Sequence, residues 1–502
     1  MTSLLTLTGY AGATSKRILA STDVVVGRAS GGAAAPEIAV VRVLARNGSP
    51  LTRAISAGFL GVSLEYTAIF PYAGRDPEAL DPVFLQLVRN LTPGQSPVLR
   101  IGGDSTDWAW YPVRGLRKPN GVRVTLTRRR LAVMQALASD LNARLIMGVD
   151  LEADSRAAAA GEANAFQHGI GKRWIEALEI GNEPNLYGTF TWYVTPDGVQ
   201  VMGRPPGYDF QSFLDEFTSF AKGLPGPLAG PATGEPSWMA DTGAFLAAEP
   251  RVRVLTLHSY PLVTCTPPSS PLYPTLAHVL APAATTGLAD SVAPSVALAH
   301  AHHLPVRVDE MNTDACGPAP GISNAFVSAL WALDALFEMD RVGVDGVNIH
   351  TYPGATYQLF TFTHARLRWR ASVTPEYYGL LMFAQAAPPG SRLIDATITN
   401  AQGVEVWATR GRKGRTRVVL INDSLDRRTI AVSAAGRRPA TLERLRAPRL
   451  TSTAGVTLGG QSFGAHTATG LLRGRSTVAR LTPRDGRYVF TLPAASAALV
   501  TF

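Results

Sequence analysis

The segments EIGNEPN (179–185) and VRVDEMN (306–312) each end an apolar, β-prone run on a glutamate. These glutamates are Glu183 and Glu310, and their separation of 127 positions (310 − 183 = 127) excludes a shared helix or hairpin. Carboxyl groups at the ends of two separate buried strands suit chemistry in which one group supplies a proton while the other attacks or activates water. The pair predicts one acid–base site assembled from two distant parts of the chain.

Eight short apolar runs alternate with helical patterns between about residues 55 and 385. The runs are FLGVSLEY (59–66), SPVLRIGG (96–103), RLIMGVDL (144–151), ALEIGNEP (177–184), PLAGPATG (227–234), VRVLTLHSYP (252–261), PVRVDEMN (305–312) and GVDGVNIHT (343–351). The fifth is the weakest, because glycine and proline dilute its β signal. Eight strands separated by helices predict a (β/α)₈ TIM barrel, and continuous apolar runs are typical of parallel strands covered on both faces.

Helical periodicity ends after about residue 390, where runs such as GVEVWATRG (403–411) and TRVVLIND (416–423) predict an all-β sandwich. The early runs DVVVG (23–27) and EIAVVRVLA (37–45) are expected to join that domain, because a closed barrel has no free edge. The chain is thus predicted to be an α/β protein. Its predicted parts are N-terminal strands in residues 1–50, the barrel in residues 51–388 and the β-sandwich domain in residues 389–502.

Polar residues collect where the predicted barrel strands end, which is where such barrels carry their active sites. They are Arg100, Asp104 and Ser105 at strand 2, Asn182 and Glu183 at strand 4, His258 and Tyr260 at strand 6, Glu310 at strand 7, and Asn348, His350 and Tyr352 at strand 8. We expect them to converge on one cleft. Taken singly, Glu183 could be a helix cap and Glu310 the partner of a buried arginine. Asp309 is expected to point the other way, as a structural residue paired with Arg307.

Three of these segments, LRIGGDSTD (99–107), LEIGNEPN (178–185) and VRVDEMN, are together similar to glycoside hydrolase family 79. That family contains β-glucuronidases and heparanase-like enzymes, and the resemblance spans roughly residues 40–502. It implies that Glu183 is the general acid/base and Glu310 the nucleophile of a retaining enzyme, whose carboxyl groups lie about 5–5.5 Å apart. It also implies hydrogen-bond donors around Glu310 from Arg100, His258 and Tyr260. Asn182 is expected to bind the 2-hydroxyl group of the sugar.

The resemblance implies a carbohydrate substrate, most simply a β-glucuronide cleaved from the chain end. Asp104, Ser105, Asn348, His350 and Tyr352 are expected to contact the sugar. Heparanase-like enzymes carry a tyrosine between the asparagine and histidine of strand 8, where this chain has Ile349. A β-glucosidase or a diglycosidase is therefore the alternative. A non-catalytic glycan-binding protein is the alternative from another class, and the presence of both glutamates argues against it.

The composition and the motifs bear on whether nucleic acid, a membrane or a cofactor is a partner of this protein. The net charge is +9, yet no nucleic-acid motif accompanies it, so the excess reflects either coding bias and solubility or attraction to an acidic glycan. No apolar run is long enough to predict a membrane span. The sequence contains none of the metal-binding or phosphate-binding motifs, and we therefore expect no metal or other cofactor.

The two cysteines, Cys265 and Cys316, follow predicted strands 6 and 7 by a few residues each. Because those strands are neighbours in a barrel, a disulfide is predicted, with two free thiols as the alternative. A disulfide favours a secreted or cell-envelope protein over a cytoplasmic one. The first residues, MTSLLTLTGYAGATSKR, lack the basic start and long apolar core of a signal peptide.

Overall fold

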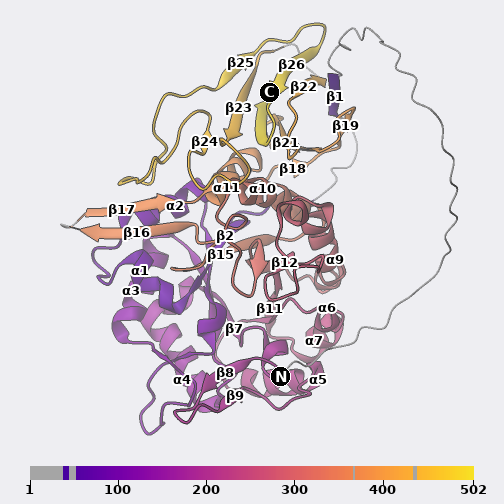
Figure 1. Cartoon of the computed structure of the whole chain (residues 1–502). Coiled ribbons are helices and arrows are strands. Elements are labelled where there is room, and N and C mark those ends of the chain that lie inside the picture. The colour runs from indigo at the N-terminus through magenta and orange to yellow at the C-terminus, as the bar shows by residue number, and fades with distance from the viewer. Residues whose placement is uncertain (1–37, 44–52, 366–367, 434–437) are drawn as a thin grey trace, which may run out of the picture. The chain divides into compact units, whose positions relative to one another are not determined.

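The computed structural model describes residues 38–43, 53–365, 368–433 and 438–502 (Figure 1). Within these ranges a closed parallel barrel of eight strands is followed by a separate β domain. The predicted fold class, a (β/α)₈ barrel with an additional β domain, is confirmed. No helix in the described ranges has both the length and the apolar character needed to cross a membrane.

Each of the eight apolar runs forms one barrel strand. The strands are β2 (Leu60–Glu65), β3 (Val98–Gly102), β6 (Arg144–Val149), β7 (Ile175–Ile180), β10 (Leu228–Thr233), β11 (Val252–Ser259), β13 (Val306–Met311) and β15 (Gly346–Thr351). They close in the order β10-β11-β13-β15-β2-β3-β6-β7, and β7 pairs with β10. All these pairings are parallel, so every strand delivers its carboxyl end to the same rim.

Helices cover the outside of the barrel. The longer ones are α2 (Pro82–Leu91), α3 (Arg128–Leu141), α4 (Arg156–Phe166), α5 (Phe210–Ala221), α7 (Thr242–Ala248), α9 (Thr286–Ala301), α10 (Phe326–Arg341) and α11 (Pro375–Ala386). Local side chains and backbone conformations determine where these helices begin and end. Thr127 caps α3 by accepting a hydrogen bond from the Arg130 amide at 3.2 Å, and Asn142 ends that helix in the left-handed conformation (φ 50°).

The β domain consists of two sheets. The first has the order β19 (Ala396–Thr399), β1 (Ile38–Val43), β22 (Arg428–Ser433) and β26 (Arg487–Leu492). The second contains β18 (Arg392–Leu393), β20 (Val404–Arg410), β21 (Thr416–Asn422), β27 (Ser496–Thr501), β23 (Ala440–Arg446), β24 (Thr457–Leu458) and β25 (Ala479–Leu481). Strand β1 pairs in parallel with β22 and antiparallel with β19. The other early run, DVVVG (23–27), lies outside the described residues.

Alternation along β21 explains why its sequence is apolar on both faces. Val418 and Leu420 belong to the core between the two sheets, whereas Val419 and Ile421 join the core that the second sheet shares with the barrel helices. The helix α10 is buried almost throughout, and Trp407 of β20 donates a hydrogen bond to Asp334 of α10 at 2.7 Å. The β domain is therefore packed directly on the barrel wall.

Short hairpins and ribbons extend the barrel rim. They are β4 (Ala109–Trp110) with β5 (Val124–Thr125), β8 (Thr191–Val194) with β9 (Gln200–Met202), β12 (Leu262–Val263) with β14 (Asp314–Ala315), and β16 (Phe360–Ala365) with β17 (Arg368–Val373). Each one contains a segment that follows a barrel strand at its carboxyl end. In Figure 1 the β16–β17 hairpin reaches outward beside α1 (Ile69–Ala73) and α2. These segments form the walls around the rim.

Strand β1 offers a test of the sandwich core. Val41 is fully buried in that core, whereas Ile38 of the same strand is 46% exposed. We expect Val41→Ala to destabilise the β domain by about 2 kcal/mol, through lost apolar burial plus a cavity. Ile38→Ala is the matched control and should change stability by about 0.5 kcal/mol or less. Thermal unfolding followed by calorimetry measures both, and equal effects would contradict the packing described.

Candidate active site

Glu183 and Glu310 meet above the centre of the barrel. One carboxylate oxygen of each, together with a ring nitrogen of His258, lie within 4.8 Å of one another. Glu183 follows β7 in the left-handed region (φ 47°), and its amide donates to the carbonyl of Ala232 in β10 at 3.0 Å. A left-handed backbone is uncommon for a residue other than glycine and concentrates at functional sites. The structure thus brings together the two glutamates that the sequence singled out.

Arg100 of β3 lies at the bottom of the site, where it bonds three other side chains. Its Nη1 lies 2.5 Å from Glu310 Oε2, its Nη2 donates to Asn182 Oδ1 at 2.8 Å, and its Nε donates to Glu179 Oε2 at 2.8 Å. The side chain is fully buried. Arg100 was expected among the donors around Glu310 and is found there, and its burial leaves no surface for a sugar. It acts instead as a positioning residue that fixes Glu310 and Asn182.

Glu310 is surrounded by groups that favour its charged form. The Tyr260 hydroxyl donates a hydrogen bond to Glu310 Oε1 at 2.8 Å, and His350 Nδ1 lies 3.8 Å from Oε2. Burial alone would raise the pKa of Glu310, but His350, His258, Arg100 and the Tyr260 hydrogen bond together hold that pKa well below its usual range. Glu310 is therefore ionised at neutral pH, as a carboxylate nucleophile must be.

His258 links the floor of the site to Glu183. Its Nδ1 lies 3.1 Å from Glu183 Oε1, and its Nε2 lies 3.4 Å from Arg100 Nη2. Because a guanidinium only donates, Nε2 accepts, and the hydrogen on Nδ1 points at Glu183. The Glu183 side chain remains 24% exposed, whereas the imidazole is buried. Glu183 is therefore oriented by the protein and still open to a substrate.

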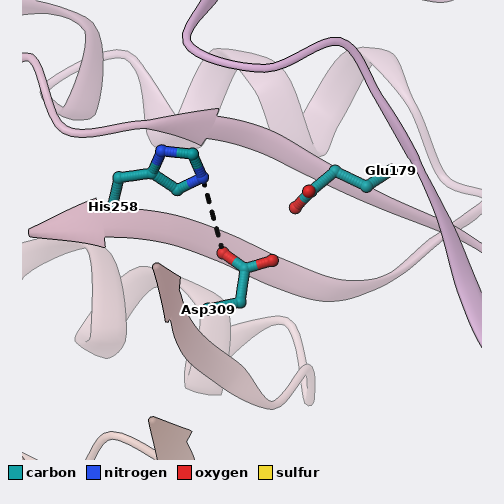
Figure 2. Close-up of side chains that lie close together, drawn as sticks. All are labelled: Glu179, His258 and Asp309. Atoms are coloured by element: carbon teal, nitrogen blue, oxygen red, sulfur yellow. Dashed lines mark ion pairs between the residues drawn. The ribbon is translucent and has the colours of Figure 1, made fainter. Parts of the chain in front are cut away.

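Figure 2 shows Glu179 of β7, His258 of β11 and Asp309 of β13, which each place one polar side-chain atom within 4.8 Å of the others. Asp309 Oδ1 lies 3.8 Å from His258 Nε2, and Oδ2 lies 3.9 Å from Arg100 Nε. Burial and the neighbouring Glu179 raise the pKa of Asp309 well above its usual range. Burial would also raise the pKa of Glu179, but Arg100 lowers it below its usual value. These shifts favour the protonated form of Asp309 and Glu179 as the charged partner of Arg100.

The inward position of Asp309 differs from the sequence expectation. Simple alternation along β13 would turn Asp309 away from Glu310, but the pairing register shifts between Leu257 and His258 of β11 and again within β13. A bulge of this kind re-aims neighbouring side chains. Arg307 does not pair with Asp309. It donates to Asn348 Oδ1 and to the carbonyl of Gly58, both at 2.9 Å.

Two residues predicted to bind substrate are occupied elsewhere. Ser105 is fully buried, and its hydroxyl and amide both bond to Glu65 Oε2. Asn348 lies deeper in the barrel, where its amide group donates to the carbonyls of Val62 and Val98 at 2.9 Å. Neither side chain has a polar group left for a sugar. Both are structural, and the substrate-binding prediction for them is corrected.

The sequence analysis missed Glu65, which ends β2 on the same rim. Its Oε1 lies 3.5 Å from His350 Nε2, and its carboxylate accepts hydrogen bonds from the amides of Asp104 and Ser105. Glu65 therefore fixes both the loop after β3 and the His350 ring, whose centroid lies 5.3 Å from that of Tyr352. The signal was present, because Glu65 closes the first apolar run in the same way that Glu310 closes the seventh.

Two cavities adjoin Glu183, with volumes of about 140 Å³ and 350 Å³. Asp104 and Glu183 border both cavities, so a substrate that spans them would carry its scissile bond past Glu183. The smaller cavity is otherwise walled by Asn182, Glu152 and aromatic rings, among them Trp108, Tyr187 and Trp192. Asn182 is held there by Arg100 and by its amide, which donates to Asp107 Oδ2 at 3.1 Å.

Two carboxyl groups of the smaller cavity have raised pKa values. Burial, Glu65, Glu310 and Glu183 raise the pKa of Asp104 to about 8, although its side chain opens into the cavity. Burial and the nearby Asp107 raise the pKa of Glu152 to about 9. Both groups therefore carry a proton at neutral pH. They present hydrogen-bond donors rather than negative charge to the cavity.

The predicted disulfide is confirmed. Cys265 and Cys316 are bonded, with a Cα–Cα distance of 5.6 Å and a sequence separation of 51. Both cysteines border the larger cavity, next to the parallel ribbon of β12 and β14. The crosslink therefore joins the loops that follow β11 and β13, the strands that carry His258 and Glu310. It closes one wall of the larger cavity, which Glu183 and His258 also border.

Carboxylates and imidazole also raise the question of a metal ion. Glu179, His258 and Asp309 form one cluster with ligand atoms close together, and Glu183, His258 and Glu310 form another. Arg100 lies between these clusters and already bonds Glu179 and Glu310. A metal cation there would have to approach a fixed guanidinium, which like-charge repulsion opposes. The residues therefore fit an arginine-centred site, and no catalytic step is derived through a metal.

The charge assignment below the site can be tested by two isosteric substitutions. Glu179→Gln removes the charged partner of a fully buried arginine and should destabilise the protein by about 3 kcal/mol. Asp309→Asn replaces a neutral acid by a neutral amide of the same shape and should cost about 1 kcal/mol or less. Urea unfolding at pH 7 measures both. A larger loss for Asp309→Asn than for Glu179→Gln would show that Asp309 carries the charge.

Comparison with known proteins agrees with this geometry. Residues 406–499 match the model of the glycosyl hydrolase family 79 C-terminal beta domain. A beta-glucuronidase of Neurospora crassa is 22% identical over 416 residues, which cover 72% of this chain and 71% of the fungal protein.

Solved structures share the fold. The 4-O-alpha-L-rhamnosyl-beta-D-glucuronidase of Fusarium oxysporum 12S, solved with Rha-GlcA, superposes with a TM-score of 0.71 at 21% identity and covers 92% of this chain and 100% of that one. A family 51 arabinofuranosidase of Xanthomonas axonopodis pv. citri gives 0.63 at 15% identity, over 92% of this chain and 99% of that one. The match of its β domain and the similarity to the Neurospora protein support a relationship to glycoside hydrolase family 79, and this chain is a glycoside hydrolase.

Proposed function

We propose that the protein is a retaining β-glucuronidase that releases terminal glucuronic acid, with Glu310 as the nucleophile and Glu183 as the general acid/base. The observation that carries this proposal is the short distance across the site, because one oxygen of each carboxylate lies within 4.8 Å of the other. Retaining glycosidases keep their two carboxyl groups about 5–5.5 Å apart, whereas inverting enzymes need about 6.5–9.5 Å to admit a water.

The environments of the two glutamates support different roles. Glu310, held ionised by Arg100 and Tyr260, attacks the anomeric carbon while the bond to the leaving oxygen breaks. Glu183 gives its proton to that oxygen and then takes a proton from the water that hydrolyses the glycosyl ester of Glu310. His258 keeps Glu183 aimed throughout. Asn182, fixed by Arg100, is placed to bind the sugar 2-hydroxyl, a contact that strengthens in the transition state.

Two lines of support favour a glucuronide. The relatives with related sequence or fold include proteins named for action on β-glucuronides. The protonated Asp104 and Glu152 also allow a sugar carboxylate to enter the smaller cavity without repulsion and to accept hydrogen bonds there. A neutral sugar would gain less from those two donors. The proposed sugar specificity therefore depends on the protonated state of Asp104 and Glu152 as well as on the shape of the cavity.

The disulfide supports the expectation that the protein is secreted or lies in the cell envelope. The disulfide between Cys265 and Cys316 stabilises the site wall by restricting a 51-residue loop. Such bonds persist in oxidising compartments and are rare in the reducing cytosol. We therefore propose that the enzyme works outside the cytoplasm, as a secreted or cell-envelope protein.

The roles of the two glutamates can be separated by azide rescue. On p-nitrophenyl β-glucuronide, we expect Glu183→Ala and Glu310→Ala each to lose about 10³-fold or more in kcat. Azide should restore turnover of both variants. It should give the β-glucuronosyl azide with Glu183→Ala, where it replaces water, and the α-azide with Glu310→Ala, where it replaces the nucleophile.

The outcome also discriminates between the substrates. Cleavage of p-nitrophenyl β-glucoside by the wild type, with no cleavage of the glucuronide, would overturn the sugar specificity and leave the mechanism intact. Release of internal rather than terminal residues from an end-labelled oligoglucuronide would overturn the chain-end action. Azide products with the two configurations exchanged would reverse the assigned roles.

The pH dependence follows from the raised pKa values. Asp104 and Glu152 are neutral below about pH 8 and about pH 9, respectively, and they become charged as the pH rises through those values. The new negative charge repels the sugar carboxylate, so kcat/KM for the glucuronide should fall above about pH 8. Asp104→Asn cannot ionise and should move that fall upward, towards the pKa of Glu152.

A neutral substrate provides the control for this pH effect. The glucuronamide of the same aglycone carries no carboxylate, and its kcat/KM should fall less over the same range. The same alkaline fall for the glucuronide and the glucuronamide would mean that another group titrates.

A further inference from the structure

A second cavity lies on the barrel rim and shares no residue with the two cavities of the glutamate site. Its volume is about 940 Å³. We call it the arginine cavity, and its polar and aromatic walls are Arg75, Asp76, Arg129, His364, Arg368 and Trp369, with Phe70 beside them. The function derived above uses none of these residues.

The position of this cavity follows from the chain topology. Its walls come from α1 and the segment after it, from the amino end of α3, and from the β16–β17 hairpin. These elements follow β2, β3 and β15, which are adjacent strands in the barrel. Figure 1 shows the hairpin close to α1 and α2. Because connections after parallel barrel strands lie at the carboxyl rim, the arginine cavity opens at the same end as the glutamate site.

The arginine cavity is rich in uncompensated positive charge. Arg75, Arg129 and Arg368 are all exposed, and none has a carboxylate oxygen within 4.0 Å among the residues that the structure describes. Asp76 is the one acid in the cavity wall, and its Oδ1 accepts a hydrogen bond from the Glu78 amide. Arg129 Nε donates to the carbonyl of Arg75 at 2.6 Å, which ties the two arginines to one edge.

Aromatic rings line the same cavity. The rings of His364 and Trp369 stack across the hairpin with centroids 4.3 Å apart and planes 14° from parallel. Phe70 is held by cation–π contacts from Arg75 at 5.1 Å and Arg130 at 4.3 Å. Fixed aromatic planes suit the apolar C–H faces of sugar rings, while guanidinium groups suit carboxylates, which they bind with paired hydrogen bonds. One cavity therefore combines recognition elements for both parts of a uronic acid.

We propose that the arginine cavity is a second carbohydrate-binding site, which holds an acidic polysaccharide chain through its sugar carboxylates. It does no chemistry, because no carboxyl pair borders it. It would keep the enzyme on a polymeric substrate and raise the local concentration of chain ends at the glutamate site. This inference goes beyond the proposed catalytic function and does not depend on it.

The test uses polygalacturonate, an α-linked polymer of uronic acid that a β-glucuronidase does not cleave. In native gels that contain polygalacturonate, the wild-type protein should be retarded, and in gels with neutral dextran it should not. The double variant Arg75→Gln/Arg368→Gln should bind the acidic polymer roughly tenfold more weakly, because two exposed charge pairs are lost. Trp369→Ala should weaken binding without changing the net charge.

A matched control separates this site from general basicity. Arg415→Gln/Arg475→Gln removes the same two charges from exposed positions of the β domain and should bind like the wild type. Hydrolysis of p-nitrophenyl β-glucuronide should be unchanged in all these variants, so loss of the binding site is distinguished from failure of the proposed catalysis. An unretarded wild-type protein would overturn the proposal. So would an equal loss of binding in both double variants, or undiminished binding of Arg75→Gln/Arg368→Gln.

Discussion

One buried guanidinium organises the site of this enzyme. Arg100 is fully buried in the barrel, yet it bonds Glu179, Glu310 and Asn182 with its three nitrogen atoms. A buried charge of this kind is tolerated only when charged and hydrogen-bonded partners surround it. The arginine therefore forces carboxylates from β7 and β13 towards the barrel axis. The free-energy cost of burying the Arg100 charge is thus offset in part by Glu310 and Asn182, which are also the groups that the proposed reaction needs.

The two buried carboxyl groups beside Arg100 have pKa values shifted in opposite directions. Arg100 lowers the pKa of Glu179 against the effect of burial, whereas burial and the neighbouring Glu179 raise the pKa of Asp309. Arg100 can then share its remaining donors between Glu310 and Asn182. His258 completes the arrangement, since it receives a hydrogen bond from the floor and directs its own hydrogen at Glu183. Glu183 and Glu310 thus differ in their hydrogen-bond partners, which are His258 for the first and Arg100 and Tyr260 for the second.

The sequence was enough to predict the eight barrel strands and the β domain, because buried parallel strands read as apolar runs and β21 is apolar on both faces. It also singled out Glu183 and Glu310, whose roles remain predictions. The sequence could not indicate how deeply each polar side chain lies within the barrel. Asn348 and Ser105 lie near the strand ends like their neighbours, but they are saturated by carbonyls and by Glu65. Nor could regular alternation anticipate the register shifts that turn Asp309 inward.

The stereochemistry of the first product tests the central claim most directly. If Glu183 and Glu310 act on opposite sides of one anomeric centre through a covalent glycosyl ester, cleavage of p-nitrophenyl β-glucuronide must release β-glucuronic acid first. Proton NMR of the anomeric signal in the first minutes, before mutarotation, distinguishes the two products. A β-anomer that appears first and then equilibrates is the predicted result. The α-anomer appearing first would mean direct attack by water and would contradict the account.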